Sequence, residues 1–280
     1  MKSGGAQAQA LRRLGKNKSA MAGFILFALI SLACIFAPCL THWGYGEFDI
    51  PNRLSGPSRA HILGTDNFGR DVFSRLLYGG RVTLGIAFFS TFLASSIGSV
   101  IGLIAGYFGS RVDYWISPLL NTLASVPAII LALVFEAVFS RGHGYFMYAI
   151  VIAAIPQFAR LIRASVINIM GREYIAASQA LGLGHFGIIL RHILPNVAPT
   201  LMIRITGGVS ESLLICTVMG YLMIGIRPPI PEWGGIIQNA YAFIRLFPHM
   251  MIIPCAVVSA CVISINLFGN GLRDAFDPRD

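Results

Sequence analysis

The stretch EYIAASQALGLGHFGIILRHILPN, residues 173–196, interrupts a chain that is otherwise apolar enough to lie in lipid. Gly182 and Gly184 permit a sharp break in its middle, and Pro195 is expected to end its second half. Apolar residues recur at helical spacing on both sides of the break, at Tyr174, Ala177 and Leu181 and then at Phe186, Ile189, Leu190 and Ile193. The pattern predicts a short amphipathic hairpin that fits either the lipid interface or a groove on another protein.

The composition around this hairpin indicates a membrane protein. The 280 residues are 55% hydrophobic and only 12% charged, whereas soluble domains carry about a quarter charged residues. The net charge of +9 fits cytoplasmic loops rich in Lys and Arg better than nucleic-acid binding, and we expect no nucleic-acid partner. No lysine follows Lys18, so the chain lacks a lysine-containing phosphate-binding loop.

Six apolar stretches are long enough to cross a membrane, which takes about 20 residues. They cover residues 20–40, 82–107, 113–139, 145–162, 199–226 and 248–267. We therefore expect an all-α integral membrane protein with six transmembrane helices. Its parts are a basic leader (1–19), a first helix (20–40), an extracytoplasmic loop (41–80), a five-helix core (81–272) that includes the loop 163–196, and a tail (273–280).

The charge pattern orients these helices. The basic leader favours the cytoplasm for the N-terminus, and six crossings return the C-terminus to the same side. The arginine-rich loop 163–196 is then cytoplasmic as well. The first helix is expected to be an uncleaved anchor, because Ala37-Pro38-Cys39 is a poor signal-peptidase site.

Small residues inside the apolar stretches leave two questions open. Gly98, Gly102 and Gly106 recur every four residues, which indicates close helix packing either within one bundle or at a subunit interface. The chain has five cysteines without a C-x-x-C pair, favouring small buried side chains over a disulfide or metal site. They are Cys34, Cys39, Cys216, Cys255 and Cys261.

The hairpin sequence resembles a known family. Ala176-Ala177-Ser178-x-x-x-Gly182, followed by His192-Ile193-Leu194-Pro195, is similar to the EAA loop of permease subunits of bacterial ABC importers. Ala176 stands where the family's general pattern has Glu, a departure common in its peptide and nickel branch. Three other stretches resemble the same branch: HILGTDNFGRDVFSRLLYGGRVTLGIA (61–87), GIRPPIPEWGGIIQNA (225–240) and GNGLRDAFDP (269–278). The resemblance is closest to the C-type permease subunit of dipeptide, oligopeptide and nickel importers.

This resemblance implies a type I ABC importer permease fold in the bacterial inner membrane, with both termini cytoplasmic. It implies a heterodimer with a B-type permease, two ATPase subunits that hold ATP and Mg²⁺, and an extracytoplasmic binding protein. The chain itself would hold no cofactor, metal or catalytic residue. The residues implied to couple it to the ATPases are Ala176, Ala177, Gly182, His185, Phe186 and Pro195, and His185 is either a docking contact or a solvated turn residue.

A carboxylate within a span also needs an explanation. Glu211 would cost roughly 2.5–3.5 kcal/mol at the centre of a membrane helix, so it is expected to face a cavity or a partner. With Ser210 and Ser212 it could line a translocation cavity and contact a peptide amine or cation. A structural pair with Arg204 is the alternative, although we expect that arginine to reach the headgroups.

The segment 41–80 is expected to contain a short amphipathic helix over about residues 68–78, capped by Asp66. This helix would lie flat on the outer surface of the bundle, either as a lid or as a contact for the binding protein.

Four functions remain to be weighed. Import of di- or oligopeptides is the first, and import of nickel or a metal chelate by the same machine is the second. A membrane enzyme is disfavoured because H-E-x-x-H and G-x-S-x-G motifs are absent. An ATPase-independent channel or carrier would have no use for the hairpin. A soft-metal site is also disfavoured, because Met219, Met223, His249, Met250 and Met251 form no obvious cluster.

Overall fold

A computed structural model describes residues 12–139 and 145–276, and this part of the chain is helical with irregular connections. Part of the predicted leader (1–11) and of the predicted tail (277–280) lies outside the described residues. The helices are α2 (Lys18–Ile35), α3 (Ala37–Leu40), η1 (Ile50–Asn52), α4 (Val72–Phe108), α5 (Ser110–Ser125), α6 (Ala128–Val138), α7 (Phe146–Met170), α8 (Glu173–Ala180), α9 (His185–Ile188), η2 (Ile189–Ile193), α10 (Leu194–Tyr221), α11 (Trp233–Tyr241) and α12 (His249–Phe276).

Five helices of the described chain are long and apolar enough to span a membrane, and a bent pair can supply a sixth span. The pair is α5 and α6, which meet at 84°. The expected straight helix over 113–139 is therefore wrong. Pro127 precedes α6, and a proline disfavours helical geometry in the residue before it, so the chain turns at Val126.

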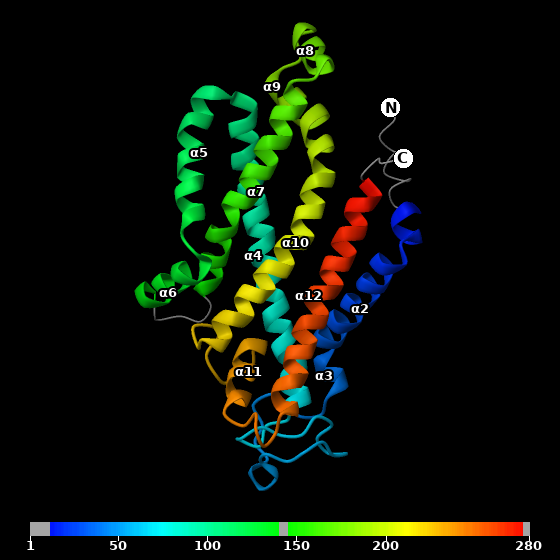
Figure 1. Cartoon of the computed structure of the whole chain (residues 1–280), viewed down its shortest axis with the longest axis vertical. Helices are drawn as coiled ribbons and strands as arrows, with labels where there is room; N and C mark the ends of the chain where they lie inside the picture. The colour runs from blue at the N-terminus through cyan, green and yellow to red at the C-terminus, as the bar shows by residue number, and fades with distance from the viewer. Residues whose placement is uncertain (1–11, 140–144, 277–280) are drawn as a thin grey trace.

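The bundle has two distinct ends (Figure 1). The hairpin of α8 and α9 projects from one end, the end toward which the start of α2 and the end of α12 also lie. Residues 41–71, which we call the cap segment, cover the opposite end next to α11. The two features that stand outside the candidate spans therefore lie at opposite ends of the bundle.

The start of α4 differs from expectation. The helix begins at Val72, and Asp71 is its N-cap, accepting a hydrogen bond from the Ser74 amide at 2.7 Å. Asp66 instead accepts from the amides of Phe68 and Arg70 in the preceding turn. The first turns of α4 continue directly into the span, so no separate helix over 68–78 lies flat on the bundle.

The glycine stripe of α4 packs inside the bundle. A Cβ added at Gly98 would lie 2.7 Å from Cβ of Phe158 on α7, and one at Gly106 would lie 2.8 Å from Cβ of Val166. Only glycine allows the two backbones to approach so closely. The stripe is thus a contact between α4 and α7 of one chain, which decides the question that the sequence left open.

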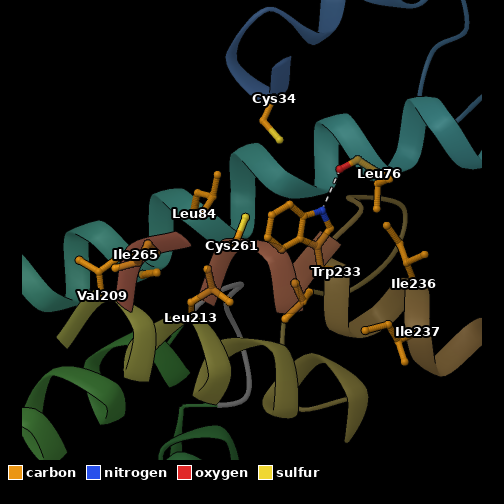
Figure 2. Packing of buried hydrophobic residues seen from close by; sticks show 12 residues of the cluster. Cys34, Leu76, Leu84, Val209, Leu213, Trp233, Ile236, Ile237, Cys261 and Ile265 are labelled. Carbon is orange, nitrogen blue, oxygen red and sulfur yellow. Dashed lines mark hydrogen bonds between the residues drawn. The ribbon is translucent and has the colours of Figure 1, made fainter. Parts of the chain in front are cut away.

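A core around Trp233 joins α2, α4, α10, α11 and α12 at the cap end (Figure 2). The Trp233 indole is fully buried and donates a hydrogen bond to the Leu76 carbonyl oxygen at 2.8 Å, tying α11 to α4. Cys34 of α2 and Cys261 of α12 pack in the same cluster. All five cysteines are free and four are at least partly buried, while Cys39 is exposed.

Candidate functional site

The hairpin turns at Gly182. Its φ of +81° is in the left-handed region, and a Cβ there would meet nothing within 4 Å. The Gly182 amide donates to the Gln179 carbonyl and the Leu183 amide to the Ser178 carbonyl, which closes the end of α8. The requirement at this position is therefore conformational and does not arise from crowding.

One face of the hairpin anchors it to the bundle. Ile175, Ile188 and Ile193 are almost fully buried and pack with Val166 and Ile169 of α7. The predicted stripe of Tyr174, Ala177 and Leu181 points outward instead. A helix of eight residues makes barely two turns, so its contact with α7 sets which face is buried and the sequence pattern does not.

The other face stands free in this chain. Leu181 is 88% exposed and Phe186 is 73% exposed, and Ala176 and Ala177 are exposed as well. Large apolar side chains held outside the spans on a rigid turn mark an interaction surface. The free face suits a partner with an apolar cleft.

His185 connects the hairpin to α4. Its Nδ1 lies 2.7 Å from the Tyr107 hydroxyl, and the two rings meet edge to face at 5.6 Å. Tyr107 is buried near the end of α4. The imidazole, predicted as a docking contact or a solvated residue, is held by its own chain in this arrangement.

Pro195 does not end the hairpin, contrary to expectation. The helix runs without a stop from His185 to Tyr221, through the π-helical turn η2, and Pro195 lies in the first turn of α10. The Leu194 amide donates to the Ile189 carbonyl, five residues back. The wider turn gives Pro195 a place in the helix without a regular α-helical hydrogen bond at this point.

Charged residues form a stripe on α10. Arg204 and Glu211 form an ion pair with 2.9 Å between Nη2 and Oε2, which is the structural pair that the sequence left open as the alternative to a cavity. Arg204 also donates to Gln157 of α7 and lies over the Phe158 ring. Its guanidinium is therefore held by residues of α7 and α10.

The other two members of the predicted cavity point elsewhere. Ser210 and Ser212 are buried in the bundle, and Ser212 accepts a hydrogen bond from Thr91 at 3.0 Å. Half of the Glu211 side-chain surface is exposed. Consecutive residues of a helix face different directions, so the three cannot line one cavity in this chain.

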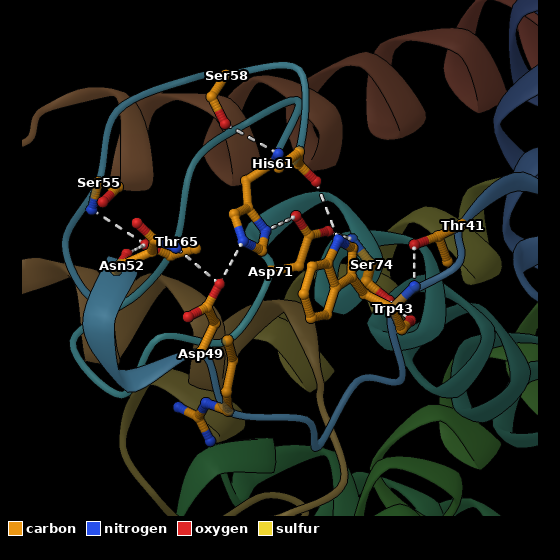
Figure 3. Close-up of polar contacts among 12 residues, drawn as sticks. Thr41, Trp43, Asp49, Asn52, Ser55, Ser58, His61, Thr65, Asp71 and Ser74 are labelled. Atoms are coloured by element: carbon orange, nitrogen blue, oxygen red, sulfur yellow. Dashed lines mark hydrogen bonds and ion pairs between the residues drawn. The ribbon is translucent and has the colours of Figure 1, made fainter.

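The cap segment contains a polar centre that sequence patterns did not indicate (Figure 3). His61 is buried, with Nδ1 2.9 Å from Asp71 Oδ1 and Nε2 3.3 Å from Asp49 Oδ2. Trp43 stacks on its ring. Hydrogen bonds from Asn52 and from His61 lower the pKa of the Asp49 carboxyl. The centre fastens the cap segment to the start of α4.

Glu232 was also missed. It is 2% exposed and accepts a hydrogen bond from the Ile226 amide, just before α11. Burial raises its pKa to about 7. A Cβ at Gly225 would lie 2.5 Å from one carboxylate oxygen, so glycine makes room for the side chain. The glycines near Glu232, at positions 220, 225 and 234, are the sequence feature that could have indicated a closely packed side chain here.

Among the described residues, no group of three His, Cys, Asp or Glu side chains is placed to hold a metal. The charged stripe and the free hairpin face are therefore the candidate functional surfaces of the described chain. A bundle of candidate spans with a charged pair on one helix and an exposed apolar hairpin at one end indicates a membrane-embedded subunit of a transport system.

Comparison with known families agrees with this class. Residues 98–279 match the model of the binding-protein-dependent transport system inner membrane component, and residues 8–57 match the N-terminal transmembrane domain of oligopeptide transport permease C. The chain belongs to the family of binding-protein-dependent inner membrane transport components, as a C-type permease of an ABC transporter. It is a multi-pass inner membrane protein and is the permease, not the ATPase, so it works with ATPase and binding-protein partners.

Several curated relatives align over nearly the whole chain. The dipeptide transport system permease protein of Alkalihalophilus pseudofirmus is 38% identical over 97% of this chain and 89% of its own. The glutathione transport system permease protein of Pectobacterium atrosepticum is 33% identical over 96% and 89%. The dipeptide permease of Haemophilus influenzae is 32% identical over 94% and 92%.

A solved structure shares the fold. An inward-facing methionine ABC transporter chain aligns with a TM-score of 0.56 and 21% identity, covering 71% of this chain and 95% of the other. At this identity the similarity concerns the fold alone, and it supports the expected importer permease architecture.

Proposed function

We propose that this permease imports short peptides, and that its hairpin docks on an ATPase subunit in the cytoplasm. The observation that carries the docking role is the free hairpin face, with Leu181 and Phe186 exposed on a turn that is anchored from behind by buried isoleucines. The names of the dipeptide and glutathione permeases that align over nearly the whole chain support a peptide cargo.

Within the proposed complex, a related B-type permease completes the pore and two ATPase subunits hold ATP and Mg²⁺. The hairpin, the start of α2 and the end of α12 lie at one end of the bundle (Figure 1). We assign this end to the cytoplasm because the leader and the hairpin loop are rich in Lys and Arg. The cap segment then faces the binding protein.

The test is uptake into proteoliposomes that contain the whole complex. A labelled dipeptide, a labelled oligopeptide and Ni²⁺ or its chelate are offered through the binding protein, with and without the ATPase subunits. We expect ATP-dependent peptide uptake. Uptake of nickel alone would change the cargo, and uptake without the ATPase subunits would overturn the docking role of the hairpin.

A further inference from the structure

A cavity with both polar and apolar lining residues lies beside the charged stripe, in the half of the bundle nearest the hairpin. Its volume is about 430 Å³, and α7, α10 and α12 form its walls. Cavities of roughly 300–1,000 Å³ accommodate small molecules. The lining includes Arg204 of α10 together with Asn266, Asn270 and Arg273 of α12.

Helical spacing places these side chains on facing stripes. Asn266, Asn270 and Arg273 follow one another at steps of four and three residues on α12, which is one face of a helix. Arg204 and Glu211 are seven residues apart on α10 and are joined by their ion pair. Such residues are expensive against lipid, so these faces line a water-filled space or meet a partner.

The two arginines of the cavity, Arg204 and Arg273, differ in whether a carboxylate neutralises their charge. Arg204 is held by Glu211 and Gln157, which neutralises and orients its guanidinium. Within residues 12–139 and 145–276, no carboxylate forms an ion pair with Arg273. The cavity thus offers a cation and neighbouring amide groups to an incoming anion. Glu211 is not a lining residue; it lies one helical turn beyond Gly207 of the lining, paired with Arg204 and with half of its side chain exposed.

We propose that this cavity binds a short zwitterionic peptide during its passage, with Arg273 and Asn270 holding the α-carboxylate. The inference rests on the proposed import of peptides and adds a contact site to it. A single anion such as a lipid phosphate would need only the arginine, whereas the half-exposed Glu211 carboxylate one turn beyond the lining supplies the opposite charge that a zwitterion requires. Arg273 belongs to the GNGLRDAFDP stretch, which the docking role of the hairpin leaves without a function.

The experiment measures uptake of labelled alanyl-alanine and of its C-terminal amide by the full complex in proteoliposomes. Arg273→Gln removes the charge in the cavity, and Arg273→Lys keeps it. The control is Arg111→Gln, which removes an exposed arginine at the same end of the bundle but outside the cavity. ATPase activity stimulated by the loaded binding protein reports that each variant is assembled.

We expect Arg273→Gln to lower free-acid uptake about tenfold, the weight of a lost charge-assisted hydrogen bond. Uptake of the amide should change little, so the ratio of acid to amide uptake falls. Stimulated ATPase activity should be retained. Arg273→Lys should fall between Arg273→Gln and the wild type, and Arg111→Gln should match the wild type in both substrates. The binding protein is the same throughout, so a changed ratio originates in the permease.

Equal ratios in Arg273→Gln and the wild type would overturn the carboxylate site while leaving peptide import intact. Absence of peptide uptake by the wild type would overturn the proposed function and this inference together. The measurements are repeated in vesicles of phosphatidylcholine alone and with added phosphatidylglycerol. A defect confined to the anionic vesicles would assign the cavity to a lipid headgroup and overturn the peptide site.

Discussion

Replacing Gly182 should weaken docking of the ATPase in proportion to the cost of its backbone conformation. The position has a φ of +81° and open space around it, so a new side chain meets a conformational penalty and no clash. Left-handed geometry costs an L-residue about 1–2 kcal/mol, and Asn tolerates it better than Ala or Val. A cost of this size shifts the population of the formed hairpin roughly 5- to 30-fold.

The assay titrates the ATPase subunits against the purified permease pair and measures the dissociation constant. We expect affinity to fall in the order glycine, Gly182→Asn, Gly182→Ala, Gly182→Val, with uptake following the same order. Gly184→Ala is the matched control, because Gly184 has an extended backbone with a φ of −67° and equally open space. The reasoning would be refuted by wild-type affinity in Gly182→Val, or by an equal loss in Gly184→Ala.

Three further predictions test the packing and the loops. Gly98→Ala should destabilise the protein by about 1–3 kcal/mol because its methyl group would lie 2.7 Å from Cβ of Phe158. The control Gly85→Ala, on the same helix, meets nothing within 4 Å and should stabilise the protein by about 0.5–1 kcal/mol. Thermal unfolding in detergent compares the two variants, and a higher melting temperature for Gly98→Ala than for the wild type would contradict the close packing. Tyr107→Phe should speed hydrogen exchange across residues 173–196, reflecting a lost hydrogen bond of about 0.5–1.5 kcal/mol, and unchanged exchange there would show that His185 does not anchor the hairpin. The Glu232 carboxyl has a folded-state pKa of about 7, above its ordinary value of 4.5, so its stabilising effect is present below pH 4.5 and is lost as the pH rises through 7. The free energy of unfolding of the wild type should therefore fall by up to about 3 kcal/mol between pH 5 and pH 8. The same fall of stability with pH in Glu232→Gln would rule out this carboxyl as the source.

Long apolar runs made the spans predictable, because the length of a membrane helix is set by the thickness of the bilayer. The turn between α5 and α6 was not, since the same run of residues is apolar on both sides of Pro127. Pro195 was misjudged for the opposite reason. Proline usually ends a helix, but the π-helical turn before it lets the chain continue into α10.

The candidate site was predictable in part. The hairpin and its turn follow from Gly182, but its buried face depends on the fit of Ile175 and Ile188 against α7, which short helices do not encode in their own pattern. His61 and Glu232 lie in loops, and loops lack the repeating apolar pattern by which a sequence indicates buried positions in a helix. Their partners, such as Asp49 and Asp71 for His61, come together only once the cap segment folds onto α4.

Because the helix is continuous from His185 to Tyr221, the second half of the hairpin and the following span can move together as one rod. Its 37 residues correspond to a rod about 55 Å long, so a tilt of roughly 5° displaces one end relative to the other by about 5 Å. The far end of the rod meets the Glu232 carboxylate at Gly220. A displacement of Phe186 at one end of this helix is therefore transmitted to the loop at its other end, with the π-helical turn and Pro199 as the two places where the helix can bend.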